Sequence, residues 1–101
     1  MKSKGSHRDS KEAFSEGLGE FFKKKREVLK KTQKEASDFL GYSSPQFISN
    51  FERGLCGLPL NKLKKLGDFY GISVKQLSKV IMDAYRRYLE QELKTSKKNH
   101  A

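Results

Sequence analysis

Hydrophobic residues recur every three or four positions along most of the chain, the spacing that places side chains on one face of an α-helix. The first run comprises Phe14, Leu18 and Phe22, with Leu29 seven residues further on. It predicts a helix over residues 12–30. No segment shows the strict alternation of apolar and polar residues that is typical of a β-strand. The pattern therefore predicts an all-α fold.

Capping residues and glycines mark the ends of two short helices. Residues 32–35 (Thr-Gln-Lys-Glu) have the spacing of a capping box, and Gly41 supplies a left-handed residue that stops a helix. Pro45 suits the first turn of the next helix, because its missing N–H would be unpaired there anyway, and Gly54 ends that helix. Two short helices joined by three or four residues are typical of a helix-turn-helix. They are expected at residues 33–40 and 45–53.

Two further helices follow a loop. An Asn61 cap opens the first, which ends at Gly71, and residues 73–76 have the spacing of a second capping box. The apolar positions of the last helix continue as far as Leu93. We therefore expect five helices in total. The chain is expected to divide into a flexible basic tail (residues 1–11), a helix-turn-helix domain (12–74), a C-terminal helix (75–94) and a second flexible tail (95–101).

Composition excludes several classes of protein. A chain of 101 residues has room for one small core, and 35% hydrophobic residues are too many for a wholly disordered chain. The sequence has no apolar run of roughly 18 residues for a membrane span and no secretory signal at its start, so a cytoplasmic location is expected. A single cysteine, Cys56, excludes a disulfide framework and a Cys-based zinc cluster. Without a nucleophile–base pair, a phosphate loop or a metal set, we expect no enzyme, no cofactor and no metal.

Basic residues outnumber acidic ones, 22 to 12, which gives a net charge of +10. The surplus lies at the two ends of the chain. Residues 1–34 carry 11 basic and 5 acidic side chains, residues 35–74 carry 4 of each, and residues 75–101 carry 7 and 3. A surplus of this size favours a polyanionic partner, nucleic acid before an anionic membrane surface. The alternative is that the lysines serve only solubility.

An ordered set of residues agrees in type and spacing with a known family. The set comprises Arg26, Thr32, Gln33, Gly41, Ile48, Glu52, Arg53, Gly54, Pro59, Gly71, Ile72 and Ser73. Through these residues the segment 18–77 resembles the lambda-repressor/Cro-type (XRE) family of helix-turn-helix DNA-binding domains. The resemblance implies a five-helix bundle whose third helix lies in the major groove of duplex DNA. Two features depart from the family: the stretch 41–52 is one residue longer than in the shorter repressors, and Ser37 stands where alanine is usual.

The third helix is expected to have an inward apolar face and an outward polar face. Ile48 and Phe51, three residues apart, share the inward face. Side-chain amides suit base reading, because they can donate to N7 and accept from N6 of adenine as a bidentate pair. Gln46 has an alternative role, since it would belong to a capping box if Ser43 caps the helix. For the outward face as a whole, the alternative is an ordinary solvated surface that contacts no DNA. The residues predicted to contact bases are Ser44, Gln46, Ser49 and Asn50.

Glu52 lies four residues after Ile48, on the inward edge of the same helix. An unpaired buried carboxylate costs several kcal/mol, and Arg26, on the inward stripe of the first helix, is the obvious partner. The family pairs these two positions. We therefore predict a structural ion pair that orients the third helix. The residues predicted to contact phosphates are Gln33, Lys34, Ser43 and Arg53.

The apolar stripe of the last helix is longer than a small core requires. It packs either on its own domain or on a second copy of the chain, and we favour a homodimer formed through Leu77, Ile81, Ala84, Tyr85 and Tyr88. A twofold dimer would bind half-sites about 34 Å apart on double-stranded DNA. The expected function is sequence-specific regulation of transcription by repression. The alternative is an antitoxin-type DNA-binding protein whose C-terminal helix also binds a small protein partner.

Overall fold

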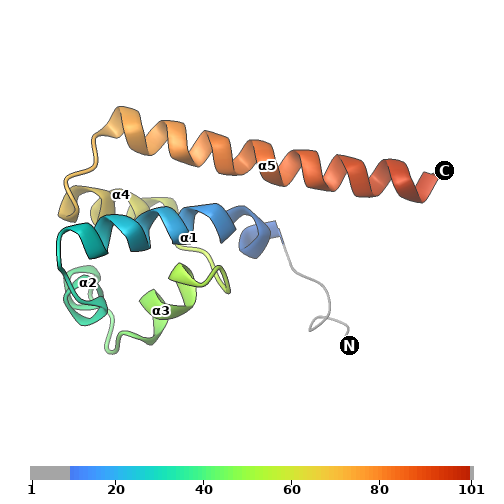
Figure 1. Ribbon diagram of the computed structural model, residues 1–101. Coiled ribbons are helices and arrows are strands. Elements are labelled where there is room, and N and C mark those ends of the chain that lie inside the picture. Colours follow the sequence, from blue (N-terminus) through green and yellow to red (C-terminus); the bar gives the residue numbers. More distant parts are fainter. Residues whose placement is uncertain (1–9, 101) are drawn as a thin grey trace.

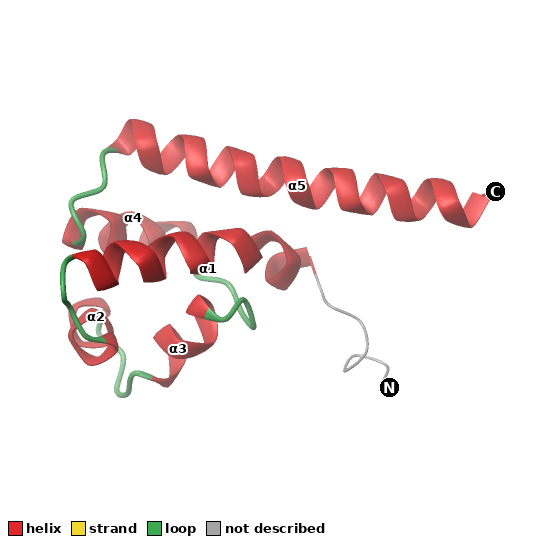
Figure 2. Ribbon diagram, in the orientation of Figure 1, coloured by secondary structure: helices red, strands yellow, loops and turns green. Residues whose placement is uncertain are grey.

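Five α-helices form the part of the chain that the computed structural model describes, as Figure 1 and Figure 2 show. The structure describes the backbone of residues 10–100 and the side chains of residues 17–94. No strand occurs among these residues, and the all-α prediction is confirmed. The N-terminal tail expected at 1–11 lies, except for its last two residues, outside the described part. In chain order the helices are α1 (Ser10–Val28), α2 (Gln33–Leu40), α3 (Gln46–Glu52), α4 (Leu60–Phe69) and α5 (Val74–His100).

The core forms around Phe22 of α1, which is fully buried. Its ring lies 5.6 Å from the ring of Phe51 in α3 and 6.2 Å from that of Tyr70, the residue that follows α4. Burying a side chain of this size stabilises the fold by about 1.5–3 kcal/mol. α1 is thus the helix against which α3 rests. The other buried hydrophobic residues are Leu18, Ala36, Leu40, Ile48, Phe51, Leu63, Leu66, Tyr70, Ile72, Leu77 and Ala84.

α1 ends at Val28, two residues earlier than predicted, because the chain turns at a residue other than glycine. Lys30 adopts a left-handed conformation with φ of 58°. Its N–H donates to the carbonyl of Glu27 at 3.0 Å, and the Lys31 N–H donates to that of Arg26 at 3.1 Å. This pairing satisfies the last carbonyls of a helix in the Schellman manner. As a result Leu29 is 44% exposed. The prediction that Leu29 continues the inward apolar stripe is wrong.

Both ends of α2 lie at the predicted residues, whereas α4 starts differently from the prediction. Thr32 and Glu35 form the expected capping box, and Gly41 closes α2 with φ of 85°. The prediction that Asn61 caps α4 is wrong. The helix begins at Leu60 after Pro59, whose carbonyl accepts the N–H groups of residues 62 and 63. Proline fixes its own φ and so can start a helix without a side-chain cap.

α5 lies along α1 and continues to His100, past the predicted end at residue 94 (Figure 1). Leu77 and Ala84, predicted to face a second subunit, lie in the core of their own domain, 8% and 2% exposed. Ile81 packs partly buried against the same core. Apolar residues at three- and four-residue spacing also line the outer side of this helix. They are Met82, Tyr85, Leu89 and Leu93, which are 61%, 46%, 38% and 62% exposed.

Candidate nucleic-acid interface

α3 crosses α1 at a glycine. A Cβ atom on Gly19 would overlap the carbonyl oxygen of Phe51 and lie 3.0 Å from that of Glu52. Glycine therefore allows the C-terminal end of α3 to approach the backbone of α1 closely. Gly17 differs, since a Cβ there would meet the guanidinium of Arg87, the mobile end of a long side chain. Of these two glycines, only Gly19 is required by backbone packing.

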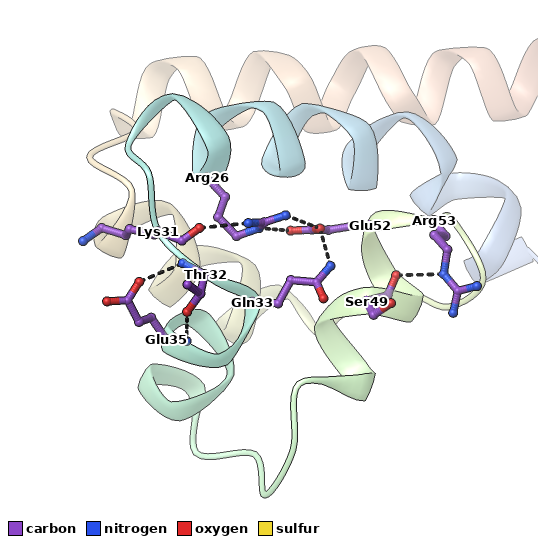
Figure 3. A network of polar contacts seen from close by, with 8 residues as sticks. All are labelled: Arg26, Lys31, Thr32, Gln33, Glu35, Ser49, Glu52 and Arg53. Carbon is purple, nitrogen blue, oxygen red and sulfur yellow. Dashed lines mark hydrogen bonds and ion pairs between the residues drawn. The ribbon is translucent and has the colours of Figure 1, made fainter.

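A buried ion pair fixes the orientation of α3 on α1, as Figure 3 shows. Arg26 Nε lies 2.7 Å from Glu52 Oε2, and Arg26 Nη2 lies 3.0 Å from Glu52 Oε1. The side chains of Arg26 and Glu52 are 12% and 2% exposed. Two parallel hydrogen bonds between a guanidinium and a carboxylate set both distance and direction. The structure thus brings together the two residues that the sequence pairs.

The same pair also holds the loop before α2 and the first residue of α2. Arg26 Nη1 donates to the carbonyl of Lys31 at 2.8 Å, and Gln33 Nε2 donates to Glu52 Oε1 at 2.9 Å (Figure 3). Four hydrogen bonds therefore tie α1, α2 and α3 into one unit. The Gln33 amide nitrogen, expected at a phosphate, is engaged with Glu52, and this bond could not be foreseen from spacing alone.

Burial and charge shift two pKa values in this network. The hydrogen bonds that Arg26 donates to Glu52 raise the pKa of Arg26 above its ordinary value, so the guanidinium stays charged. The Tyr70 hydroxyl is buried beside the pair and has no hydrogen-bond partner among the described residues. Desolvation, with the nearby Glu52 carboxylate, raises the pKa of Tyr70 well above its usual range. Both groups therefore keep one protonation state at neutral pH.

The two departures from the family pattern meet each other in space. Ser37 of α2 is completely buried, and its hydroxyl donates to the carbonyl of Ser44 at 2.6 Å. Ser44 belongs to the stretch 41–52, which is one residue longer than in the shorter repressors. A buried hydroxyl must find an acceptor, because an unsatisfied one costs about 1–3 kcal/mol. Ser37 thereby anchors the turn between α2 and α3 to α2.

The outer side of α3 carries a row of hydrogen-bonding side chains. Gln46 Nε2 donates to Asn50 Oδ1 at 3.0 Å, and Arg53 Nη2 donates to the same oxygen at 2.8 Å. Arg53 Nε also contacts the Ser49 carbonyl at 3.4 Å (Figure 3). These two hydrogen bonds use Gln46 Nε2 and Asn50 Oδ1, and do not involve Gln46 Oε1 or Asn50 Nδ2. The row thus presents one amide oxygen as an acceptor and one amide nitrogen as a donor.

Gln46 does not form the capping box with Ser43 that the sequence leaves open. Its N–H donates to Ser44 Oγ at 3.3 Å, while its side chain is directed to Asn50. Ser43, Ser44 and Gln46 are exposed, and Asn50 is half-buried. These four residues line one groove, whereas Ser49, also half-buried, is not part of its lining.

Two aromatic residues of this groove were not predicted as site residues. The rings of Tyr42 and Phe47 stack at 4.6 Å with 10° between their planes. Phe47 lies on the border between the inward and outward faces of α3, where helical periodicity assigns no clear environment. An apolar residue at such a border is the signal that could have found it.

The helix-turn-helix segment carries little positive charge. Residues 33–54 contain two basic and three acidic side chains. Lys34 Nζ lies 3.1 Å from Asp38 Oδ2 in an exposed pair. The stretch 23–31, at the end of α1 and in the following loop, instead contains six basic residues. The positive charge available to attract a polyanion therefore lies mainly outside residues 33–54.

Comparison with known proteins identifies this arrangement. A family model, HTH_3, described as helix-turn-helix, matches residues 22–81, which is more than half of the chain. The chain belongs to this lambda-repressor/Cro-type helix-turn-helix family. Its HTH_3 domain indicates a DNA-binding regulator, and the family is not enzymatic. No curated protein and no solved structure gives a significant match.

The residues that the structure describes contain neither a candidate metal centre nor a candidate membrane span. No three His, Cys, Asp or Glu side chains among them lie close enough to hold a metal ion. None of the helices found there combines the length and apolar character of a membrane span.

Proposed function

We propose that the protein is a sequence-specific transcriptional repressor that reads the major groove with the outer side of α3. The observation that carries the proposal is the amide pair Gln46–Asn50. It lies on the exposed side of a helix whose other side is fixed by Arg26, Glu52 and Gly19. Side chains on a rigid element can be held at the distances that base reading requires.

The amide pair matches one base edge best. Gln46 Oε1 is an acceptor and Asn50 Nδ2 is a donor. The hydrogen bond from Gln46 Nε2 to Asn50 Oδ1 holds the two side chains next to each other. Adenine presents N6 as a donor and N7 as an acceptor in the major groove. We therefore assign an adenine to this pair, with Ser44 and Ser49 as flanking contacts. A good bidentate contact discriminates against a wrong base by about 1–3 kcal/mol.

Phosphate contacts on this proposal flank the outer face of α3. Lys34, Ser43 and Arg53 are exposed and lie on or beside the helix-turn-helix. Gln33 takes part through its remaining oxygen and its backbone, since its amide nitrogen donates to Glu52. The lysines of residues 23–31 supply most of the attraction.

We further propose that the outer side of α5 joins two copies of the chain. α5 has 27 residues against 19 in α1, and its C-terminal part extends past the other helices (Figure 1). The exposed apolar residues there recur on one side of the helix, from Met82 to Leu93. Leu77 and Ala84 serve the core, so the dimer surface lies to the side of the predicted one, with Tyr85 common to both.

Sedimentation equilibrium at tens of micromolar tests the dimer. The wild type is expected to sediment as a dimer and a Leu89→Glu variant as a monomer, because the new carboxylate would be buried at the contact. Leu60→Glu, on a 69% exposed leucine of α4, is the matched control and should remain dimeric. A monomeric wild type would contradict the dimer and leave the DNA-binding proposal intact.

The same outer side of α5 supports an antitoxin-type role as the second candidate, in which a small protein partner covers Met82 to Leu93. Purification of the native protein from its own cells separates the two roles. A partner at fixed stoichiometry, lost in Leu89→Glu, would favour the antitoxin, whereas a protein that is recovered alone favours the repressor.

Selection of bound duplexes from a random pool, at a stated salt concentration, tests the main proposal. We expect an enriched sequence with two symmetric half-sites about one helical turn apart. A reporter gene behind that sequence should then be less expressed when the protein is present. Absence of any enriched sequence would refute sequence-specific binding.

A further inference from the structure

We propose that Phe47 recognises the methyl group of a thymine, which makes it a specificity-determining residue of the interface. The inference rests on the proposed function, because it requires the outer side of α3 to meet duplex DNA. It adds a contact that hydrogen bonding by the amide pair does not provide.

Phe47 is held as a fixed apolar surface. One face of its ring stacks on Tyr42, and 37% of the residue remains exposed. Tyr42 is held in turn by Lys62 of α4, whose Nζ lies 5.1 Å from the centre of the tyrosine ring. The same ammonium donates to the carbonyl of Leu40 at 2.9 Å, at the end of α2. Phe47 is therefore preorganised before any ligand binds.

The groove beside this ring combines apolar and neutral polar groups. It encloses about 250 Å³ and is lined by Tyr42, Ser43, Ser44, Gln46, Phe47 and Asn50. No charged side chain is part of this lining. Arg53 and Lys62 contact the lining residues Asn50 and Tyr42 but are not part of the lining. The groove itself therefore suits a neutral occupant with an apolar group next to hydrogen-bonding groups.

Thymine fits this description among the four bases. It alone presents a methyl group in the major groove, and apolar side chains such as phenylalanine contact that methyl. The adenine assigned to Gln46 and Asn50 is paired with a thymine, so one A·T pair, or two neighbouring pairs, can satisfy the amides and Phe47 together. We therefore expect the half-site to contain a thymine whose methyl group lies against Phe47.

Replacing single thymines of the selected duplex by deoxyuridine tests the proposal, because uracil differs from thymine only by the missing methyl group. At one position, the replacement should weaken binding of the wild type roughly fourfold, the factor expected for one buried methyl group. In Phe47→Ala this penalty should fall below about 1.5-fold. Phe47→Leu, which keeps an apolar side chain and part of the stack, should show an intermediate penalty and serves if the alanine variant does not fold.

Phe39 provides the matched control. It is 47% exposed and stacks on Phe69 at 4.4 Å with 15° between the planes, but it lies on the α4 side of α2. Phe39→Ala should keep the full deoxyuridine penalty. An equal deoxyuridine penalty in wild type and Phe47→Ala would overturn the inference, as would the absence of a penalty at every thymine. Weaker binding of Phe47→Ala without a deoxyuridine effect would also overturn it and would assign the ring to the sugar–phosphate backbone. Failure to select any duplex would instead refute the proposed function itself.

Discussion

Removal of Arg26 from the ion pair is the perturbation whose effect on stability can be worked out most directly. In Arg26→Leu the Glu52 carboxylate, with a side chain 2% exposed, keeps only its hydrogen bond from Gln33. Breaking a buried pair by removing one partner typically costs about 3–5 kcal/mol. With a urea slope near 2 kcal/mol/M, the unfolding midpoint should fall by about 2 M. A domain at the lower end of the usual range of roughly 5–15 kcal/mol would be left close to unfolding.

Urea unfolding followed by circular dichroism measures this change, and two further variants interpret it. Lys64→Leu removes a pair in which both side chains are 61% exposed, and should cost less than about 1 kcal/mol. The double variant Arg26→Leu with Glu52→Leu should regain most of the stability, since a buried pair can often be replaced by apolar residues without loss. It should nevertheless bind the selected duplex more weakly, because α3 has lost its orienting contact. Equal costs for Arg26→Leu and Lys64→Leu would contradict a stabilising role of the buried pair, and wild-type affinity in the double variant would contradict its role in orienting α3.

Three further predictions concern the helix contacts and the charge. Gly19→Ala should destabilise the fold by about 1–3 kcal/mol, because the new Cβ meets the backbone of α3. Gly17→Ala should be neutral or should stabilise the fold by up to about 1 kcal/mol, and thermal unfolding of both variants measures this difference. Ser37→Ala should cost about 1 kcal/mol in urea unfolding through loss of the bond to the Ser44 carbonyl, and an unchanged midpoint would contradict that role. The logarithm of DNA affinity should fall linearly with the logarithm of salt concentration, by about 0.9 per neutralised phosphate, and a salt-independent affinity would contradict the role given to the lysines.

Helix ends that rest on local chemistry could be predicted from the sequence. The capping box at Thr32 and the left-handed Gly41 place both ends of α2 correctly, because each signal acts within a few residues. The end of α1 and the start of α4 were not predicted correctly, because neither carries the usual glycine or capping residue. Lys30 adopts the left-handed conformation without being glycine, and Pro59 starts a helix without a capping side chain.

Contacts between helices could be predicted only where the alternative is costly. Glu52 lies on an inward edge, and a buried carboxylate needs a cation, so periodicity and electrostatics together point to Arg26. Phe47 offers no such constraint, because an aromatic ring at the border of a helix face is compatible with core or surface. Periodicity along α5 shows that a stripe exists, but it does not say whether Leu77 packs on its own domain or on a second copy.

Base reading by the outer side of α3 is tested most directly by an affinity matrix, in which every base pair of the selected half-site is replaced in turn. The affinity of each duplex is measured for the wild type, Gln46→Ala and Asn50→Ala at one salt concentration. If the outer side of α3 reads bases, both variants should lose discrimination of about 1–3 kcal/mol at the same A·T pair and retain it elsewhere in the site. Discrimination that is unchanged at every position in both variants would contradict the account.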